Sequence, residues 1–258
     1  MRYAYLVVEG PHDVEFIGRL LKPHQFKREN NESRLDPYWR PLVPTKFPYG
    51  GDLSRRVPVP TFFVSDTVSV AVHASGGDSE IANRVEETLQ AALTTLPEAV
   101  GVLLDADSVK SPGVRFGDVR EALLDKVKLT IPDQPGQVSA TSPRCGIFVL
   151  PDNVNAGTLE SLLLECGDSQ YAALLADVRS LVGKVQTGVH ALTPDDLKDF
   201  NKPAGPHKAM VACMAGILRP GKAIQVSIQD NRWLEGVSLD LPRISAVRRF
   251  LRELLLLP

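Results

Sequence analysis

Two short stretches decide the fold: residues 5–13 read YLVVEGPHD, and residues 102–108 read VLLDADS. Each is an apolar run that ends in carboxylates, with Glu9 after the first run and Asp105 and Asp107 after the second. Short runs that are apolar on both faces are typical of central strands in a parallel sheet covered by helices. Both stretches are therefore predicted to be buried strands with acidic residues at their carboxyl ends.

The surrounding sequence repeats this pattern. Residues 68–73 and 146–150 predict two further strands, and helical spacing of apolar residues follows each strand, at 13–21, 79–96, 117–127 and 158–165. Strand and helix alternate four times, which favours an α/β fold with right-handed crossovers. We expect a central, mostly parallel sheet of about four strands flanked by helices.

Two regions depart from this alternation. Residues 24–66 form a Pro-rich insertion in which 57–64 could be an edge strand. Residues 167–258 predict a mainly helical carboxyl-terminal extension that packs on the domain formed by residues 1–166. The extension should contain helices at 171–182, 205–218 and 242–256 and a strand at 224–228. The last helix should pack on the sheet, with four arginines on its solvated face, Arg243, Arg248, Arg249 and Arg252.

Composition narrows the class of protein. The chain has 258 residues, 43% of them hydrophobic and 23% charged, with a formal net charge of −2. It is therefore not a polycation that would coat nucleic acid, and phosphate contacts would need a local basic patch or a bound metal. Three well-separated cysteines support neither disulfides nor a zinc site. With no signal peptide and no apolar run long enough to span a bilayer, we expect a cytoplasmic protein without membrane association.

The acidic residues at the strand ends are the main functional signal. Ligands of open parallel sheets bind beyond the carboxyl ends of the strands, where Glu9, Asp105, Asp107 and also Asp152 fall. Alternation along an extended chain points Asp105 and Asp107 to the same side, so both could hold one divalent cation. Carboxylates packed this closely repel one another, and a hard cation such as Mg²⁺ relieves that repulsion.

These residues resemble the Toprim signature. An apolar strand followed by E-G-x-x-D (Glu9 to Asp13), joined with a later strand followed by D-x-D (Asp105 to Asp107), is similar to the domain shared by topoisomerases, bacterial primases, OLD-type nucleases and RecR-type recombination proteins. The Toprim resemblance covers roughly residues 1–166. Residues 150–167 and 202–216 resemble an uncharacterised prokaryotic branch of Toprim-related proteins.

The resemblance implies roles for individual residues. Glu9 would be a general acid/base or a metal ligand, and Asp105 and Asp107 would hold Mg²⁺ or Mn²⁺. Glu160 resembles an added acidic position of the OLD-type nucleases, with Asp152 as its rival. Lys208 or Lys202 would complete the site. A separate ATPase subunit is a partner of many such nucleases, and a homodimer is compatible with the resemblance.

Each of these residues also has a purely structural interpretation. Glu9 or Asp13 could cap the following helix, Asp152 could shape a turn, and Glu160 could simply favour a helix amino terminus. His12 lies beside the acidic centre and could touch a phosphate or face solvent. In the insertion, residues 24–60 carry seven Lys/Arg against four Asp/Glu, with aromatic residues between them. Arg55 and Arg56 with these rings could grip a nucleic-acid strand, although aromatics packed on the domain are slightly favoured.

Three functions follow from this sequence. The first is Mg²⁺-dependent phosphodiester chemistry on nucleic acid, DNA or RNA, most simply a nuclease and therefore a hydrolase. The second is a non-catalytic Toprim module that binds nucleic acid or a protein partner. The third takes VLLDADS as the motif of a haloacid-dehalogenase-type phosphatase or a sugar-nucleotide site, which leaves Glu9 unexplained.

Overall fold

The computed structural model describes residues 1–46, 59–91, 93–106 and 111–258. Its centre is a six-stranded sheet in the order β2-β3-β4-β1-β5-β6. Four strands are parallel: β1 (Arg2–Val8), β4 (Val68–Ala74), β5 (Ala99–Asp105) and β6 (Arg144–Leu150). The two others, β2 (Lys27–Glu29) and β3 (Thr61–Val64), are antiparallel and come from the insertion. The mostly parallel α/β fold expected from the sequence is confirmed.

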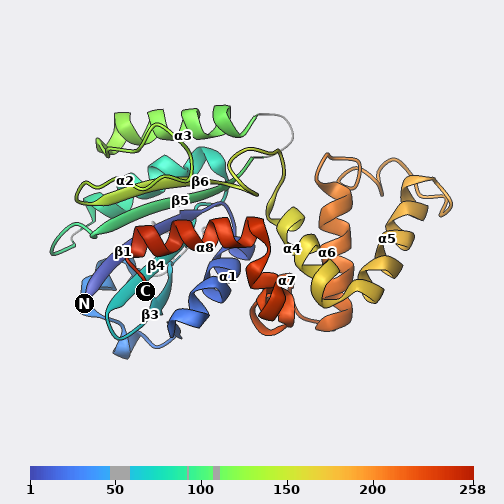
Figure 1. Cartoon of the computed structure of the whole chain (residues 1–258), viewed down its shortest axis with the longest axis horizontal. Helices are drawn as coiled ribbons and strands as arrows, with labels where there is room; N and C mark the ends of the chain where they lie inside the picture. The colour runs from blue at the N-terminus through green and yellow to red at the C-terminus, as the bar shows by residue number, and fades with distance from the viewer. Residues whose placement is uncertain (47–58, 92, 107–110) are drawn as a thin grey trace.

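Helices cover both faces of this sheet (Figure 1). One face carries α2 (Ile81–Gln90) and α3 (Pro112–Val127), and the other carries α1 (Pro11–Leu21) and α8 (Pro242–Leu255). The remaining helices form a unit beside the sheet, at the right in Figure 1: α4 (Leu159–Gln170), α5 (Ala172–Gln186), α6 (Gly205–Leu218) and α7 (Ile224–Asp230). The helical unit continues from β6 through α4, so it lies next to the carboxyl ends of the strands.

The alternation of side chains along β1 divides the core between the two faces. Leu6 and Val8 join the cluster beneath α1 and α8, whereas Tyr5 and Val7 join the cluster beneath α2 and α3. All four side chains are fully buried. A strand buried on both faces has to be apolar throughout, which explains the continuous hydrophobic run in the sequence.

The last helix returns to the sheet and closes the core. A Cβ atom added at Gly101 on β5 would lie 2.7 Å from Leu6 and still closer to Leu254 of α8, so this glycine permits the close approach of helix and strand. Arg2 at the start of β1 donates a 3.0 Å hydrogen bond to the carbonyl oxygen of Leu255, which places the two ends of the chain side by side (Figure 1).

The insertion packs on the domain rather than projecting from it. Tyr38 stacks on Tyr3 with 3.8 Å between ring centroids, and the Trp39 indole donates a 2.8 Å hydrogen bond to Ser69 of β4. Phe26, Tyr38 and Trp39 are all buried. For these described aromatics, the packed arrangement favoured from the sequence is confirmed.

Four sequence predictions were wrong in detail. The sheet has six strands instead of about four, because short antiparallel pairing does not need the long apolar runs of a buried parallel strand. β3 is not an edge strand, since β2 covers it. Residues 224–228, predicted as a strand, begin α7, because helices surround this segment and Ser227 Oγ accepts a 3.0 Å hydrogen bond from the Trp233 indole. Two arginines of α8 are not simply solvated: Arg243 pairs with Asp152 and Glu165, and Arg248 donates to the Leu239 carbonyl.

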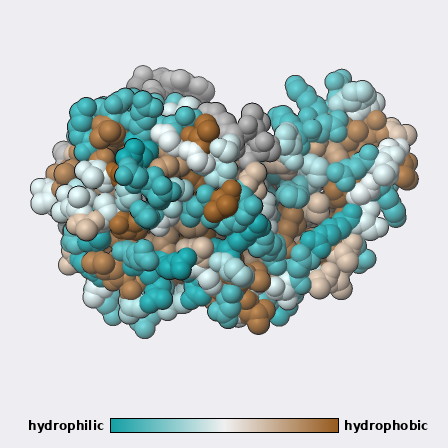
Figure 2. All heavy atoms as spheres, turned by 45° about the horizontal axis from the view of Figure 1, so that its top comes forward, coloured by the Kyte–Doolittle hydropathy of each residue, from teal (hydrophilic) through white to brown (hydrophobic). Residues whose placement is uncertain are grey.

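The outer surface is mixed in character. Figure 2 shows hydrophilic side chains over most of the visible face and hydrophobic ones gathered at the outer end of the helical unit. Leu181 of α5 and Val189 after it are 45% and 65% exposed. Within the described residues, no helix is both long and apolar enough to cross a membrane.

Candidate acidic site

The acidic site lies where the chain leaves two neighbouring strands. β1 and β5 are adjacent and parallel, with Val8 opposite Leu103, so Glu9 and Asp105 meet at one edge of the sheet. The helices that follow these strands diverge: α1 packs on one face and α3 on the other. A crevice between such diverging connections is the usual ligand position in open α/β sheets.

Glu9 is held by two donors. Its Oε1 accepts a 3.1 Å hydrogen bond from the Asp105 backbone N–H and lies 2.6 Å from the Arg115 guanidinium of α3. Arg115, with 8% of its side chain exposed, also donates from Nε to the Asp105 carbonyl oxygen at 3.1 Å. Glu9 does not cap α1, because Gly10 occupies the N-cap position. Its carboxylate instead joins the ends of β1 and β5 across the crevice.

Asp105 faces the amino terminus of α4. Its Oδ1 accepts a 2.9 Å hydrogen bond from the Leu159 N–H, in the first turn of that helix. Burial raises the pKa of the Asp105 carboxyl well above its ordinary value, and the nearby charges of Asp13, Glu9 and Glu160 raise it further. An ionised Asp105 is therefore costly unless a cation compensates it.

Asp13 belongs to the same cluster. Its Oδ2 accepts a 2.9 Å hydrogen bond from the Gly10 N–H, so it provides the N3 half of a capping box at the start of α1, where the N-cap glycine has no side chain to supply the other half. Burial raises the pKa of Asp13 from 3.8 to about 7, with Glu9 and Glu160 acting in the same direction. Asp13 therefore both caps the start of α1 and belongs to the acidic cluster, two roles that the sequence presented as alternatives.

Glu160 brings α4 and α6 into the site. It is 6% exposed, and its Oε1 lies 3.2 Å from Lys208 Nζ of α6. Partial burial lowers the pKa of Lys208, but Glu160, Asp105 and Asp13 outweigh that effect and raise it overall. The second oxygen, Oε2, is buried and has no hydrogen-bond partner within the described part of the chain. A buried carboxylate oxygen without a donor is costly, so this position suits a cation.

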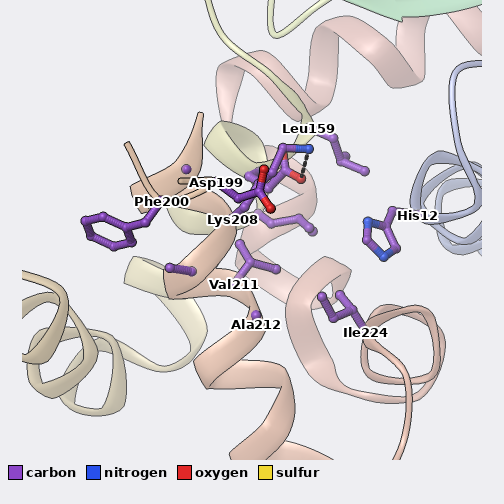
Figure 3. A pocket seen from close by; sticks show the side chains of 12 residues that line it. His12, Leu159, Asp199, Phe200, Lys208, Val211, Ala212 and Ile224 are labelled. Atoms are coloured by element: carbon purple, nitrogen blue, oxygen red, sulfur yellow. Dashed lines mark ion pairs between the residues drawn. The ribbon is translucent and has the colours of Figure 1, made fainter. Parts of the chain in front are cut away.

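An apolar pocket of about 360 Å³ adjoins this ion pair (Figure 3). His12 of α1 and Phe200, in the segment before α6, stand on opposite sides of it, with Lys208 between them in the view. Burial lowers the pKa of His12, and the positive charge of Lys208 lowers it as well, against the opposing effect of Glu160. His12 is therefore mainly neutral at pH 7 and presents an uncharged ring to the pocket.

Several predicted residues lie apart from this cluster. Burial raises the pKa of Asp152, but hydrogen bonds from Asn155 and Val154, together with Arg243, outweigh it and lower the pKa overall. These donors hold Asp152 in a turn, with Arg243 Nε at 2.8 Å. Lys202 pairs at 2.6 Å with Asp199, which lines the apolar pocket, and both are exposed. Three predicted residues lie outside the described residues: Arg55, Arg56 and Asp107.

The donor set suits a hard divalent cation by its chemistry. The cluster consists of carboxylates, of which Asp13 and Asp105 have raised pKa values, and Glu160 has a buried oxygen without a hydrogen-bond partner among the described residues. Among the described residues, however, no group of three or more His, Cys, Asp or Glu side chains is already arranged to hold a metal ion. The Glu9 carboxylate already forms an ion pair with Arg115, and one oxygen of Asp105 already accepts a hydrogen bond from the Leu159 N–H. Metal binding would therefore require these carboxylates to exchange partners.

Sequence reasoning left the role of one member of the site undecided, Asp13, and missed another, Arg115. Asp13 had a visible signal, because it is the final residue of E-G-x-x-D, but its position at a helix start masked its second role. Arg115 had no such signal: it is one arginine in the first turns of a helix, and only the tertiary structure brings it to Glu9.

Comparison with known proteins places the chain in a family. A family model described as "Protein of unknown function (DUF3226)" matches residues 3–256. The chain belongs to that family. A search of curated proteins gives no match. A crystal structure of a hypothetical protein from Pyrococcus horikoshii OT3 is similar, with 18% identity and a TM-score of 0.49, over 98% of this chain and 95% of that one. Neither description names an activity, so any function has to be inferred from the chemistry of the site.

Proposed function

We propose that the protein performs Mg²⁺-dependent phosphodiester chemistry on nucleic acid, most simply as a nuclease. The observation that carries this proposal is the packing of Glu9, Asp13, Asp105 and Glu160 in one crevice, with the pKa values of Asp13 and Asp105 raised by burial and by their neighbours. The negative charges of such a cluster repel one another, and a bound divalent cation would reduce that repulsion. The resemblance of E-G-x-x-D and D-x-D to the Toprim signature supports the same function.

The residues would divide the work by position. Glu9 and Asp105 would hold Mg²⁺ or Mn²⁺, Asp107 joins them by the sequence pattern alone, and Asp13 and Glu160 add negative charge. When bound, the ion would activate water and neutralise charge on the phosphate. Lys208, beside Glu160, would contact the phosphate, and the alternative role of Glu9, as general acid/base, would use Oε1 once Arg115 releases it. The partner of this reaction is a nucleic acid, and a separate ATPase subunit remains a prediction of the resemblance.

The test is cleavage of labelled single- and double-stranded DNA and RNA with Mg²⁺, Mn²⁺ or EDTA. We expect metal-dependent cleavage that Glu9→Gln and Asp105→Asn each reduce by at least about 100-fold, while circular dichroism stays unchanged. Asp177→Asn is the matched control, because Asp177 is an exposed carboxylate on α5. Undiminished cleavage in both site variants would refute the proposal.

One observation favours a second function. The Glu9–Arg115 ion pair occupies a carboxylate that a metal would need, which fits a module that binds nucleic acid without cleaving it. Tight strand binding without turnover under any divalent metal would identify that function. Release of phosphate from small phosphomonoesters, measured in the same series, would instead revive the phosphatase interpretation.

A further inference from the structure

We infer that the apolar pocket beside Glu160 binds the base of a nucleotide at or next to the scissile phosphate. This inference rests on the proposed function and names the part of the substrate that the protein holds. At about 360 Å³ the pocket falls within the size range of small-ligand sites, about 300–1,000 Å³.

The walls of the pocket suit a flat, uncharged group. Leu163, Val211 and Ile224 provide apolar surface, and the His12 ring stands at one side of the pocket, whereas the ring of Phe200 is turned away from Lys208 (Figure 3). Burial and Lys208 keep the His12 ring mainly neutral, so it offers a face for stacking. Bases stack on aromatic side chains without a requirement for sequence, because every base has a π-face.

The charges at the pocket fix the orientation of such a ligand. Lys208 lines the pocket, and its side chain is 61% exposed, so its ammonium group can meet a phosphate from solvent. Glu160 lines the same pocket and also contributes to the electrostatics of Asp105 and Asp13. A nucleotide with its base among the apolar residues would therefore direct its phosphate toward Lys208 and the acidic centre.

The other side of the pocket supports the same orientation. Asp199 lies at the pocket and pairs with Lys202, which adds a second exposed cation near Lys208. A strand continuing out of the pocket would meet these lysines, which are the charges that a phosphate backbone requires. This arrangement gives Lys202 a role although it lies apart from the carboxylates.

The experiment measures binding of AMP and dAMP to the full chain in EDTA, by calorimetry and by ligand-observed NMR. Binding without metal separates the pocket from catalysis. We expect saturable binding that Ala212→Trp weakens by about tenfold or more, because Ala212 lines the pocket and is exposed enough to accept a larger side chain. His12→Ala, which removes the stacking ring, should weaken binding by a similar factor.

Two control variants keep the outcomes distinct. Ile217→Trp adds the same ring on the exposed part of α6, away from the pocket-lining residues, and should bind like the wild type. Asp177→Asn, which removes an exposed carboxylate of α5 that does not line the pocket, should also bind like the wild type. Absence of saturable binding up to about 5 mM, or equal affinities for Ala212→Trp, His12→Ala and the wild type, would overturn the inference while leaving the proposed function standing. If the pocket variants weaken binding but the protein cleaves no nucleic acid, the inference about the pocket stands and the proposed nuclease activity is wrong.

Discussion

Replacing Asp13 by Asn tests whether the acidic cluster stores unfavourable charge. The side-chain oxygen of Asn can still accept the hydrogen bond from the Gly10 N–H, so the substitution removes mainly the charge. The protein should become more stable when no metal is present. A functional carboxylate that destabilises its own fold is a common cost of an active site.

The magnitude follows from the shifted pKa. Burial and neighbouring carboxylates raise the pKa of Asp13 from 3.8 to about 7. Between pH 3.8 and about 7, Asp13 is protonated in the folded protein and ionised in the unfolded chain. Proton binding therefore stabilises the folded protein at low pH, and this stabilisation is lost as the pH rises through about 7. Compared with a neutral side chain, Asp13 would destabilise the fold by on the order of 4 kcal/mol at pH 8, where it is ionised, and by about 2 kcal/mol at pH 5, where folding requires it to take up a proton. Because the side chain is partly exposed, solvent screening reduces both figures.

Thermal unfolding in EDTA at pH 8 and pH 5 measures the effect. Even about 1 kcal/mol raises the Tm of a chain of this size by about 2–4 °C, so Asp13→Asn should melt higher than the wild type, by more at pH 8 than at pH 5. Added Mg²⁺ or Mn²⁺ should raise the Tm of the wild type and have a smaller effect on the variant. Asp177→Asn, on the exposed face of α5, should match the wild type throughout.

Two results would refute this reasoning. A lower Tm for Asp13→Asn at pH 8 would mean that the carboxylate stabilises the metal-free fold and is not strained by its neighbours. An equal metal-induced rise in both proteins would mean that Asp13 takes no part in cation binding, whatever its pKa.

Three further predictions concern other parts of the structure. Gly101→Ala should destabilise the protein by about 1–3 kcal/mol in chemical unfolding, because its Cβ would collide with α8. The control Gly216→Ala, in open space on α6, should instead stabilise the protein by about 0.5–1 kcal/mol. Equal effects of the two substitutions would contradict the close packing of Gly101 against α8. Lys208→Met should lower the Tm slightly and enlarge the rise produced by Mn²⁺, since Glu160 loses its cation; an unchanged metal response would show that Lys208 does not compensate the cluster. Arg243→Ala should cost less than about 1 kcal/mol and leave cleavage intact, because its partners lie outside the acidic cluster; lost cleavage would return Asp152 to the site.

The parallel core of the fold was predictable because its signals are local. Runs such as 5–8 and 102–104 are apolar at every position, which only a strand buried on both faces requires. The positions of Glu9 and Asp105 followed from the same reasoning, since parallel strands end at one edge of the sheet. The antiparallel strands β2 and β3 were harder to predict, because both are short, β2 contains only charged residues, and pairing with a neighbour determines them.

By itself, then, the sequence determined the α/β class, the parallel strands and the residue types at their carboxyl ends. Only the tertiary structure decided which charges meet there. Arg115 reaches Glu9 across 106 positions of the chain, and Lys208 of α6 reaches Glu160 of α4. Asp152 forms an ion pair with Arg243 and does not join the acidic cluster. Strand and helix patterns arise from neighbouring residues, whereas partners of a charge depend on how separate helices pack, which no local spacing encodes.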